Sequence, residues 1–153
     1  MAKKSHIPFY TRLGNVLTLT LMRAGVKLVG PFMFFGNYPM YLFTVRGRTS
    51  GQPRTVVLAM MERNGKRYVG SPYGIVDWVR NLRAAGEAIL TRGRRAETVN
   101  AIELPKDEAA LILREETRGG NPFTHFYGVT ADSSLEEFER AVVIHPLFAL
   151  ERK

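Results

Sequence analysis

The sequence has 153 residues, 45% hydrophobic and 24% charged, a composition that excludes a disordered chain and fits one globular domain over residues 1–153. The 22 lysines and arginines outweigh 14 acidic residues, and the net charge of +8 favours an anionic partner: a nucleotide-like cofactor, nucleic acid or an anionic membrane. The absence of cysteine excludes disulfides and thiolate chemistry and agrees with a cytoplasmic location.

The first part of the chain, residues 1–38, is expected to hold a basic tail, a helix and an apolar loop. The tail, Met1 to Ser5, is not followed directly by the apolar stretch and cleavage site of a secretory signal. From Tyr10 to about Val29, apolar residues recur at the spacing of one helix face. We therefore expect an apolar N-terminal helix ahead of the main fold.

An uncharged run from Leu28 to Val45 approaches the length of a membrane span. Gly30-Pro31 and Gly36-Asn37-Tyr38-Pro39 interrupt this run, and proline removes a backbone donor that a helix needs. These breaks argue against a transmembrane helix and favour a helix and loop packed over the core. The run Phe32 to Phe35 beside cationic residues leaves a peripheral contact with a membrane open as the alternative.

Residues 39–153 show mainly the alternating pattern of β-strands. The predicted strands are Met40 to Val45, Thr55 to Met61, Arg67 to Gly70, Ala88 to Thr91, Ala96 to Ile102 and Val142 to Leu150. Asn64-Gly65 predicts a tight two-residue hairpin turn, and Gly93 marks a second hairpin. These strands predict a five- or six-stranded antiparallel sheet or small barrel.

Three helices are predicted among these strands. Val76 to Ala85 has helical spacing, and Gly86 suits its C-terminal cap. A second helix runs from Pro105 to Arg118, because proline is favoured at the first helical position. Ser133 with Glu136 fits a capping box at the start of a short third helix. The fold class is therefore mainly β with flanking helices.

The segment from Val45 to Val57 joins two apolar runs by a cationic turn rich in hydroxyl groups. Gly47 and Gly51 permit a tight turn there, and Pro53 fixes its own φ. Its cationic and hydroxyl side chains are those of Arg46, Arg48, Thr49, Ser50, Arg54 and Thr55. Arginine grips phosphate or carboxylate through paired hydrogen bonds, and turn amides can cradle an anion. An ordinary solvated hairpin loop explains the same residues.

Conventional catalytic motifs are missing from the sequence. His6, His125 and His145 are scattered without a metal-ligand partner at a telling spacing, so no metal site is expected. Ser50 and Ser71 lack the context of a hydrolase nucleophile. Neither a dinucleotide G-x-G-x-x-G nor a phosphate-loop motif occurs. The chemistry is therefore expected to come from a bound cofactor.

Nucleic acid is not an expected partner. Arg92, Arg94 and Arg95 lie beside a predicted hairpin, where a solvated sheet edge explains them most simply. A basic protein that binds nucleic acid or a membrane surface remains the rival interpretation, and its attachment would weaken steeply with salt.

Three segments resemble the deazaflavin (coenzyme F420)-dependent nitroreductase family, which belongs to the flavin/deazaflavin oxidoreductases. Gly47 to Thr55 resembles the G-R-K-[ST]-G-x-x-R signature of that family. Asp77 to Ala84 resembles its W-x-x-N-L-x-A segment, and Gly70 to Gly74 occupies the place of its small-residue cofactor loop. The three segments fall in the family's order and spacing, and the resemblance runs from about Met40 to Leu150.

The resemblance implies a split β-barrel of the FMN-binding type, with an apolar N-terminal helix that lies within residues 1–38. It implies an oxidoreductase that passes hydride from reduced F420 to a quinone, nitroaromatic or enone. The substrate would be a small apolar or aromatic molecule, and the protein a monomer or homodimer. An FMN-dependent oxidoreductase and a non-catalytic protein that binds flavin or another amphiphile remain alternatives.

The resemblance also implies which residues form the site. The cofactor would contact Arg48, Thr49, Ser50, Arg54, Thr55, Val56, Val57, Leu58, Ala59, Gly70, Ser71, Pro72, Tyr73, Asp77, Trp78, Val79, Arg80 and Asn81. Tyr127 best matches the family's aromatic residue on the substrate side and is the candidate catalytic residue, with Phe126 or Phe123 as alternatives.

Two positions depart from the family pattern. Thr49 stands where the signature has lysine, and Pro72 or Tyr73 replaces a lysine that some relatives carry in the second loop. Arg46, Arg48 or Arg80 would have to compensate for these two cations. The choice between F420 and FMN therefore stays open at the level of the sequence.

Overall fold

One curved antiparallel sheet organises the part of the chain that the structure, a computed structural model, describes: residues 34–35 and 37–153. The predicted basic tail and N-terminal helix lie outside the described residues. The strands are β1 (Phe34–Phe35), β2 (Tyr38–Arg46), β3 (Pro53–Ala59), β4 (Met61–Arg63), β5 (Lys66–Gly70), β6 (Glu87–Arg92), β7 (Arg95–Glu103) and β8 (Leu147–Arg152). Their order is β1-β2-β6-β7-β8-β5-β4, and β3 pairs with the other edge of β2.

Two tight turns fix the register of neighbouring strands. Asn64 and Gly65 both have positive φ, 49° and 74°, as a hairpin turn that matches the twist of its strands requires. Gly93, with φ of 61°, turns the chain between β6 and β7. Both hairpins that the sequence predicted are therefore confirmed.

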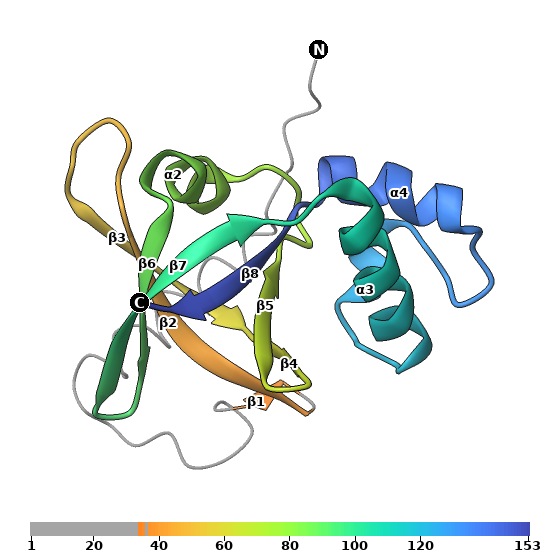
Figure 1. Cartoon of the computed structure of the whole chain (residues 1–153), viewed down its shortest axis with the longest axis horizontal. Coiled ribbons are helices and arrows are strands. Elements are labelled where there is room, and N and C mark those ends of the chain that lie inside the picture. The colour runs from red at the N-terminus through yellow and green to blue at the C-terminus, as the bar shows by residue number, and fades with distance from the viewer. Residues whose placement is uncertain (1–33, 36) are drawn as a thin grey trace.

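The main core fills the inside of the curved sheet. Its fully buried side chains include Phe43 of β2, Leu90 of β6 and Val99 of β7. The helix α2 (Asp77–Ala85) closes one end of the half-barrel with Trp78 and Leu82, and Figure 1 shows this helix lying across the end of the strands. Gly86, with φ of 71°, ends α2 in the left-handed conformation that the sequence predicted for this cap.

A second core lies between the sheet and the remaining helices. These are α3 (Lys106–Arg118), the short 3-10 helix η1 (Thr124–Tyr127) and α4 (Leu135–Ile144). Leu113 and Phe138 pack there against Tyr68 of β5 and Leu147 of β8. Figure 1 shows α3 and α4 together on one side of the sheet, away from α2. In the described part of the chain, no helix is long and apolar enough to cross a membrane.

The boundary between α4 and β8 differs from the prediction, which placed a strand from Val142. Phe138, Ala141 and Val142 share the buried face of α4, so the apolar run that suggested a strand belongs to a helix. Pro146 follows the helix, and β8 begins only at Leu147. The strand predicted from Val142 to Leu150 is therefore wrong over its first half.

The start of α4 is also shifted by one residue. Ser134, not Ser133, accepts a hydrogen bond from the backbone N–H of Glu137, whose carboxylate accepts from the N–H of Ser134. Ser133 instead accepts a hydrogen bond from the backbone N–H of Thr130. Two successive serines, each followed three residues later by glutamate, fit the capping pattern equally well, so spacing alone did not distinguish them.

The strand predicted from Thr55 to Met61 is split into β3 and β4. Met60 separates them: its side chain is fully buried, and its N–H donates to the carbonyl of Pro39 at 2.8 Å. This break and the two-residue strand β1 account for the eight strands of the sheet, where the sequence predicted five or six.

Candidate cofactor site

The loop between β2 and β3 is held in one shape by its own hydrogen bonds. The N–H of Gly47 donates to the carbonyl of Gln52 at 2.8 Å, and the N–H of Gly51 donates to the carbonyl of Gly47 at 2.9 Å. Gly51 has φ of 71°, which favours glycine. A Cβ on Gly47 would lie 2.9 Å from Oγ of Ser50 and 3.1 Å from the carbonyl oxygen of Gln52, so a side chain there would force the turn to shift. The tip residues 48–50 are exposed.

The N-terminal half of α2 anchors this loop through Arg48. The amide oxygen of Asn81, a buried residue, accepts from the backbone N–H of Arg48 at 3.1 Å and from its Nη1 at 2.7 Å. Nη2 of Arg48 reaches Oδ1 of Asp77 at 3.2 Å. The signature loop and the helix segment are thus one structural unit, although 33 residues separate Arg48 from Asn81.

The charge of Arg48 is already shared with α2, so other cations are better placed to meet an anion. Arg80 keeps half of its side chain exposed, and its ion pair with Asp77, the one it forms among the described residues, is long at 3.5 Å. Arg54 is exposed, and no carboxylate among the described residues forms an ion pair with it. The aliphatic part of the Arg54 side chain packs beside Gly47: a Cβ added to Gly47 would lie 3.5 Å from Cγ of Arg54.

Strand β3 divides its predicted cofactor residues between two faces. Val56 and Leu58 pack, half-buried, against the main core that contains Trp78. Thr55 points the other way, because its hydroxyl shares a 2.8 Å hydrogen bond with that of Thr44 on the outer face of the sheet. By the same alternation Arg54 shares the inner face, whereas Val57 and Ala59 lie on the outer face. A ligand near α2 would meet these outer residues only through their backbone.

The loop after β5, Gly70 to Gly74, forms a second closed turn. The hydroxyl of Ser71 donates to the carbonyl of Gly74, and the N–H of Gly74 donates to the carbonyl of Ser71 at 3.1 Å. The N–H of Ser71 donates to the carbonyl of Pro146 at 3.2 Å. Ser71 is buried and its polar groups are used within the fold, so Tyr73, which is half-buried, is better placed to contact a ligand.

Two aromatic segments meet beside this loop. The ring of Phe126, exposed on η1, lies 5.1 Å from the ring of Tyr73. Tyr127 is buried instead, and burial, with the negative charge of Glu116, raises the pKa of its hydroxyl above the usual value. A buried phenol that holds its proton so firmly is a weak acid, so these features argue against the proton-donor role. That role stays a prediction, and Phe126 is the aromatic residue at the surface.

His145 is the residue near the site that the sequence analysis set aside. Its Nδ1 lies 3.0 Å from the carbonyl oxygen of Ser71, and its ring lies 4.9 Å from that of Tyr127. Burial lowers the pKa of this imidazole. Its partner is 74 residues away in the chain, so no local sequence signal could have indicated the contact.

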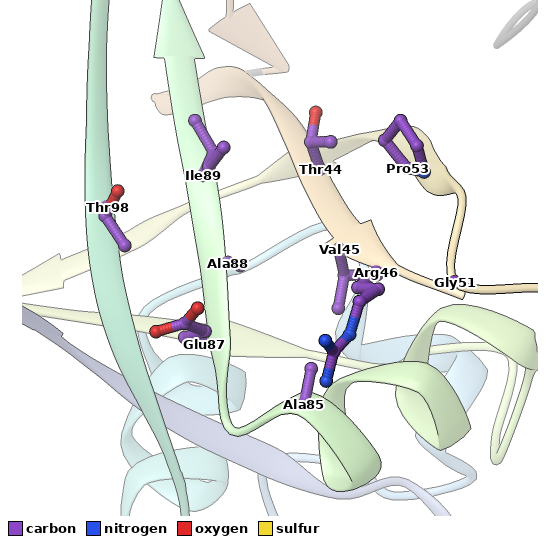
Figure 2. A pocket seen from close by; sticks show the side chains of 10 residues that line it. All are labelled: Thr44, Val45, Arg46, Gly51, Pro53, Ala85, Glu87, Ala88, Ile89 and Thr98. Atoms are coloured by element: carbon purple, nitrogen blue, oxygen red, sulfur yellow. The ribbon is translucent and has the colours of Figure 1, made fainter. Parts of the chain in front are cut away.

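A groove of about 340 Å³ lies on the outer face of the sheet, next to the signature loop. Figure 2 shows Thr44, Ile89 and Thr98, which are register partners on β2, β6 and β7, along its floor, with Arg46 pointing toward Ala85 at the end of α2. The groove is lined by Thr44, Val45, Arg46, Gly51, Pro53, Ala85, Glu87, Ala88, Ile89 and Thr98. None of the residues predicted to bind the cofactor is among them.

The four segments predicted to bind the cofactor lie near one another. The loop 48–50, the inner face of β3, the loop 70–73 and the start of α2 border the same end of the half-barrel. Within the predicted set, Val79 is fully buried and faces the core, and Asn81 is used to hold Arg48. The described part of the chain is therefore a mainly β half-barrel in which a cationic loop is fixed to a helix.

The family model of F420H(2)-dependent quinone reductases matches residues 16–135, and the chain belongs to this family. It is therefore an oxidoreductase, and its cofactor is coenzyme F420. The family assignment made from the three motifs is confirmed. No curated protein matches the chain.

Solved structures show the same fold. An F420-H2 dependent reductase (FDR-A) is 24% identical with a TM-score of 0.52, over 74% of this chain and 94% of that chain. A structure described as a domain-swapped dimer is 21% identical with a TM-score of 0.54, over 89% of this chain and 95% of that chain. The protein Atu2129 of unknown function from Agrobacterium tumefaciens is 14% identical with a TM-score of 0.51, over 99% of this chain and 57% of that chain. The predicted fold class is confirmed.

Proposed function

We propose that this protein uses reduced F420 to convert a small, apolar quinone into its quinol. The observation that carries the proposal is the double hydrogen bond from Arg48 to Asn81. It joins the signature loop to the helix segment that accompanies it in the family. The site would be the rim formed by this loop, the inner face of β3, the loop Gly70 to Gly74 and the start of α2.

The residues at this rim fit a ligand with a flat apolar ring and an anionic tail. Arg54 and Arg80 offer exposed guanidinium groups, and Thr49 and Ser50 offer exposed hydroxyls. The half-buried side chains of Val56, Leu58 and Tyr73 form an apolar wall on the main core. Arg54 is the last arginine of the family signature, so Arg80 is the exposed arginine here that would replace the lysines expected at Thr49 and in the second loop.

When bound, reduced F420 supplies a hydride, and the quinone gains that hydride and a proton. The protein's own residues bind and orient the cofactor and the substrate. Arg54 and Arg80 would hold the anionic tail, and Val56 with Leu58 would exclude water from one face of the ring. Phe126 and Tyr73 would offer an aromatic surface to a flat substrate. Nitroaromatics and enones are flat acceptors of the same kind and belong in the same assay.

The test is fluorescence titration of the purified protein with F420 and, separately, with FMN. We expect saturable F420 binding and weaker or no FMN binding. Micromolar FMN affinity without F420 binding would overturn the proposal. Oxidation of reduced F420 is then followed with quinones, nitroaromatics and enones, and tight binding without turnover on any of them would indicate a non-catalytic carrier.

Assembly and membrane contact are separate proposals. One structural neighbour is described as a domain-swapped dimer, and we propose for this chain a monomer or a homodimer. Light scattering behind a sizing column distinguishes the two. Contact of the N-terminal segment with a membrane also stays a prediction, and flotation of the full chain with anionic liposomes across a salt series tests it.

A further inference from the structure

The carbonyl of Ser71 is held from two sides. The N–H of Gly74 donates to it at 3.1 Å within the loop, and Nδ1 of His145 lies 3.0 Å from it. Because a carbonyl only accepts, Nδ1 of His145 carries the proton. Ser71 is 1% exposed, so water does not readily replace a lost donor at this carbonyl.

His145 touches this loop from a fixed position. It directly follows α4, and its N–H donates to the carbonyl of Ala141 at 2.9 Å, which extends the helix ladder by one bond. The next residue, Pro146, accepts from the N–H of Ser71. The junction of α4 and β8 therefore contacts Ser71 through a side chain and through the backbone.

Tyr127, which lies on η1, contacts both His145 and the start of the loop. Its ring packs on that of His145 at 4.9 Å, and its hydroxyl lies over Gly70, where an added Cβ would come within 2.2 Å of the oxygen. The adjacent residue, Phe126, packs on Tyr73. Segments from η1 and α4 thus hold the loop Gly70 to Gly74 at both of its ends.

We propose that His145, backed by Tyr127, is a positioning residue that holds the loop Gly70 to Tyr73 in the shape that receives the cofactor. The inference rests on the proposed function, in which this loop forms one side of the pocket. Loss of the imidazole leaves the Ser71 carbonyl with one donor and removes the ring that supports Tyr127. A loop free to shift by about 1 Å binds a rigid ring less well.

Three variants separate positioning from general stability. His145→Ala removes both the donor and the ring. His145→Asn keeps an N–H donor close to the place of Nδ1. Val142→Ala shortens a buried side chain of the second core on α4, one turn before His145, and serves as the control for stability.

The dissociation constant for F420 and the melting temperature are measured for the full chain and each variant, with hydrogen exchange of the loop peptide in the protein without cofactor. We expect His145→Ala to weaken F420 binding about tenfold, the effect of a lost hydrogen bond to a buried group, and His145→Asn to restore most of it. Val142→Ala should lower the melting temperature without changing F420 affinity. The loop peptide should exchange faster in His145→Ala alone.

Unchanged F420 affinity in His145→Ala would overturn the inference and leave the proposed function standing. An equal loss of affinity in Val142→Ala would overturn it too, because the effect would then follow stability. Absence of F420 binding by the unmodified protein would instead overturn the proposed function, and the inference with it. In that case, faster hydrogen exchange of the loop peptide in His145→Ala would show only that His145 stabilises the loop structure.

Discussion

The amide oxygen of Asn81 accepts two hydrogen bonds from Arg48, one from the backbone and one from the guanidinium. This pair fixes an exposed, cationic loop to a buried point on α2. The loop tip contributes few apolar contacts of its own, so its shape depends on this anchor and on the internal bonds of Gly47. A site that must grip an anion gains from such pre-organisation, because less freedom is lost on binding.

Asn81→Ala is expected to lower both cofactor affinity and stability. It leaves the N–H of Arg48 without its acceptor at a partly buried position, at a cost of about 1–3 kcal/mol in the free energy of unfolding. F420 affinity should fall by about tenfold or more, since the loop loses its anchor. Urea denaturation and fluorescence titration measure the two effects.

Asp77→Asn is the matched control for this prediction. The Asp77 side chain of the Arg48–Asp77 ion pair is exposed to solvent. Loss of this ion pair should therefore change the free energy of unfolding by less than about 1 kcal/mol. Asp77 belongs to the predicted cofactor site, so the comparison is made on stability: a loss in Asp77→Asn equal to that in Asn81→Ala would contradict the anchoring role of Asn81.

Arg54→Ala tests the anion-binding side of the rim. Arg54 is exposed and has no ion-pair partner among the described residues, so its removal should barely change stability. Loss of a charge-assisted hydrogen bond to the cofactor should raise the dissociation constant at least about tenfold, on the order of 1.4 kcal/mol. Arg94→Ala, an exposed arginine in the β6–β7 turn, is the control and should leave the affinity unchanged.

Thr49→Lys restores the cation that the family signature carries. The side chain is exposed at the loop tip, so the substitution should be neutral for stability. F420 affinity should rise by about three- to tenfold at low ionic strength and lose this gain in high salt, because an exposed ion pair is screened. Titrations at two salt concentrations measure it. A gain in F420 affinity that is the same at both salt concentrations would contradict the electrostatic explanation.

The local features of this fold could be read from the sequence, whereas contacts between distant segments could not. Asn64-Gly65 determines its hairpin through backbone angles that few residues adopt, so the turn was predictable from two letters. The helix containing Asn81 was also predictable from spacing. Its contact with Arg48 depends on how the sheet closes, and no pattern in either segment encodes that.

The misplaced boundary near Val142 has a comparable cause. The run from Ala141 to Ile144 is apolar and partly β-branched, which suits a strand and equally the buried face of a helix. Tertiary packing of Phe138 on the second core decides in favour of the helix. The same packing brings His145 to Ser71, so the error in the boundary hid the most informative contact of the site.

Gly70→Ala is expected to destabilise the protein through Tyr127. The added methyl group would lie 2.2 Å from the tyrosine hydroxyl and 3.5 Å from Cζ, and such overpacking costs about 1–3 kcal/mol. Removal of the hydroxyl in Tyr127→Phe relieves the closer of the two contacts. A double-mutant cycle by urea denaturation should therefore show the alanine substitution to be less costly in the Tyr127→Phe background. Additive losses would mean that the loop moves away from the ring.

The low pKa of His145 predicts a loss of stability in mild acid. Burial is the main cause of the shift, and the hydrogen bond to the Ser71 carbonyl opposes it in part. Because the folded protein favours the neutral imidazole, this contribution is fully present above the unfolded pKa of 6.5. It is lost as the pH falls from that value through the lower folded pKa, below which both states are protonated. Thermal melts between about pH 7.5 and pH 5 should show the decline. His145→Asn should remove this part of the pH dependence, whereas His125→Asn, at an exposed histidine, should keep it. An unchanged pH profile in His145→Asn would assign the acid sensitivity to other groups.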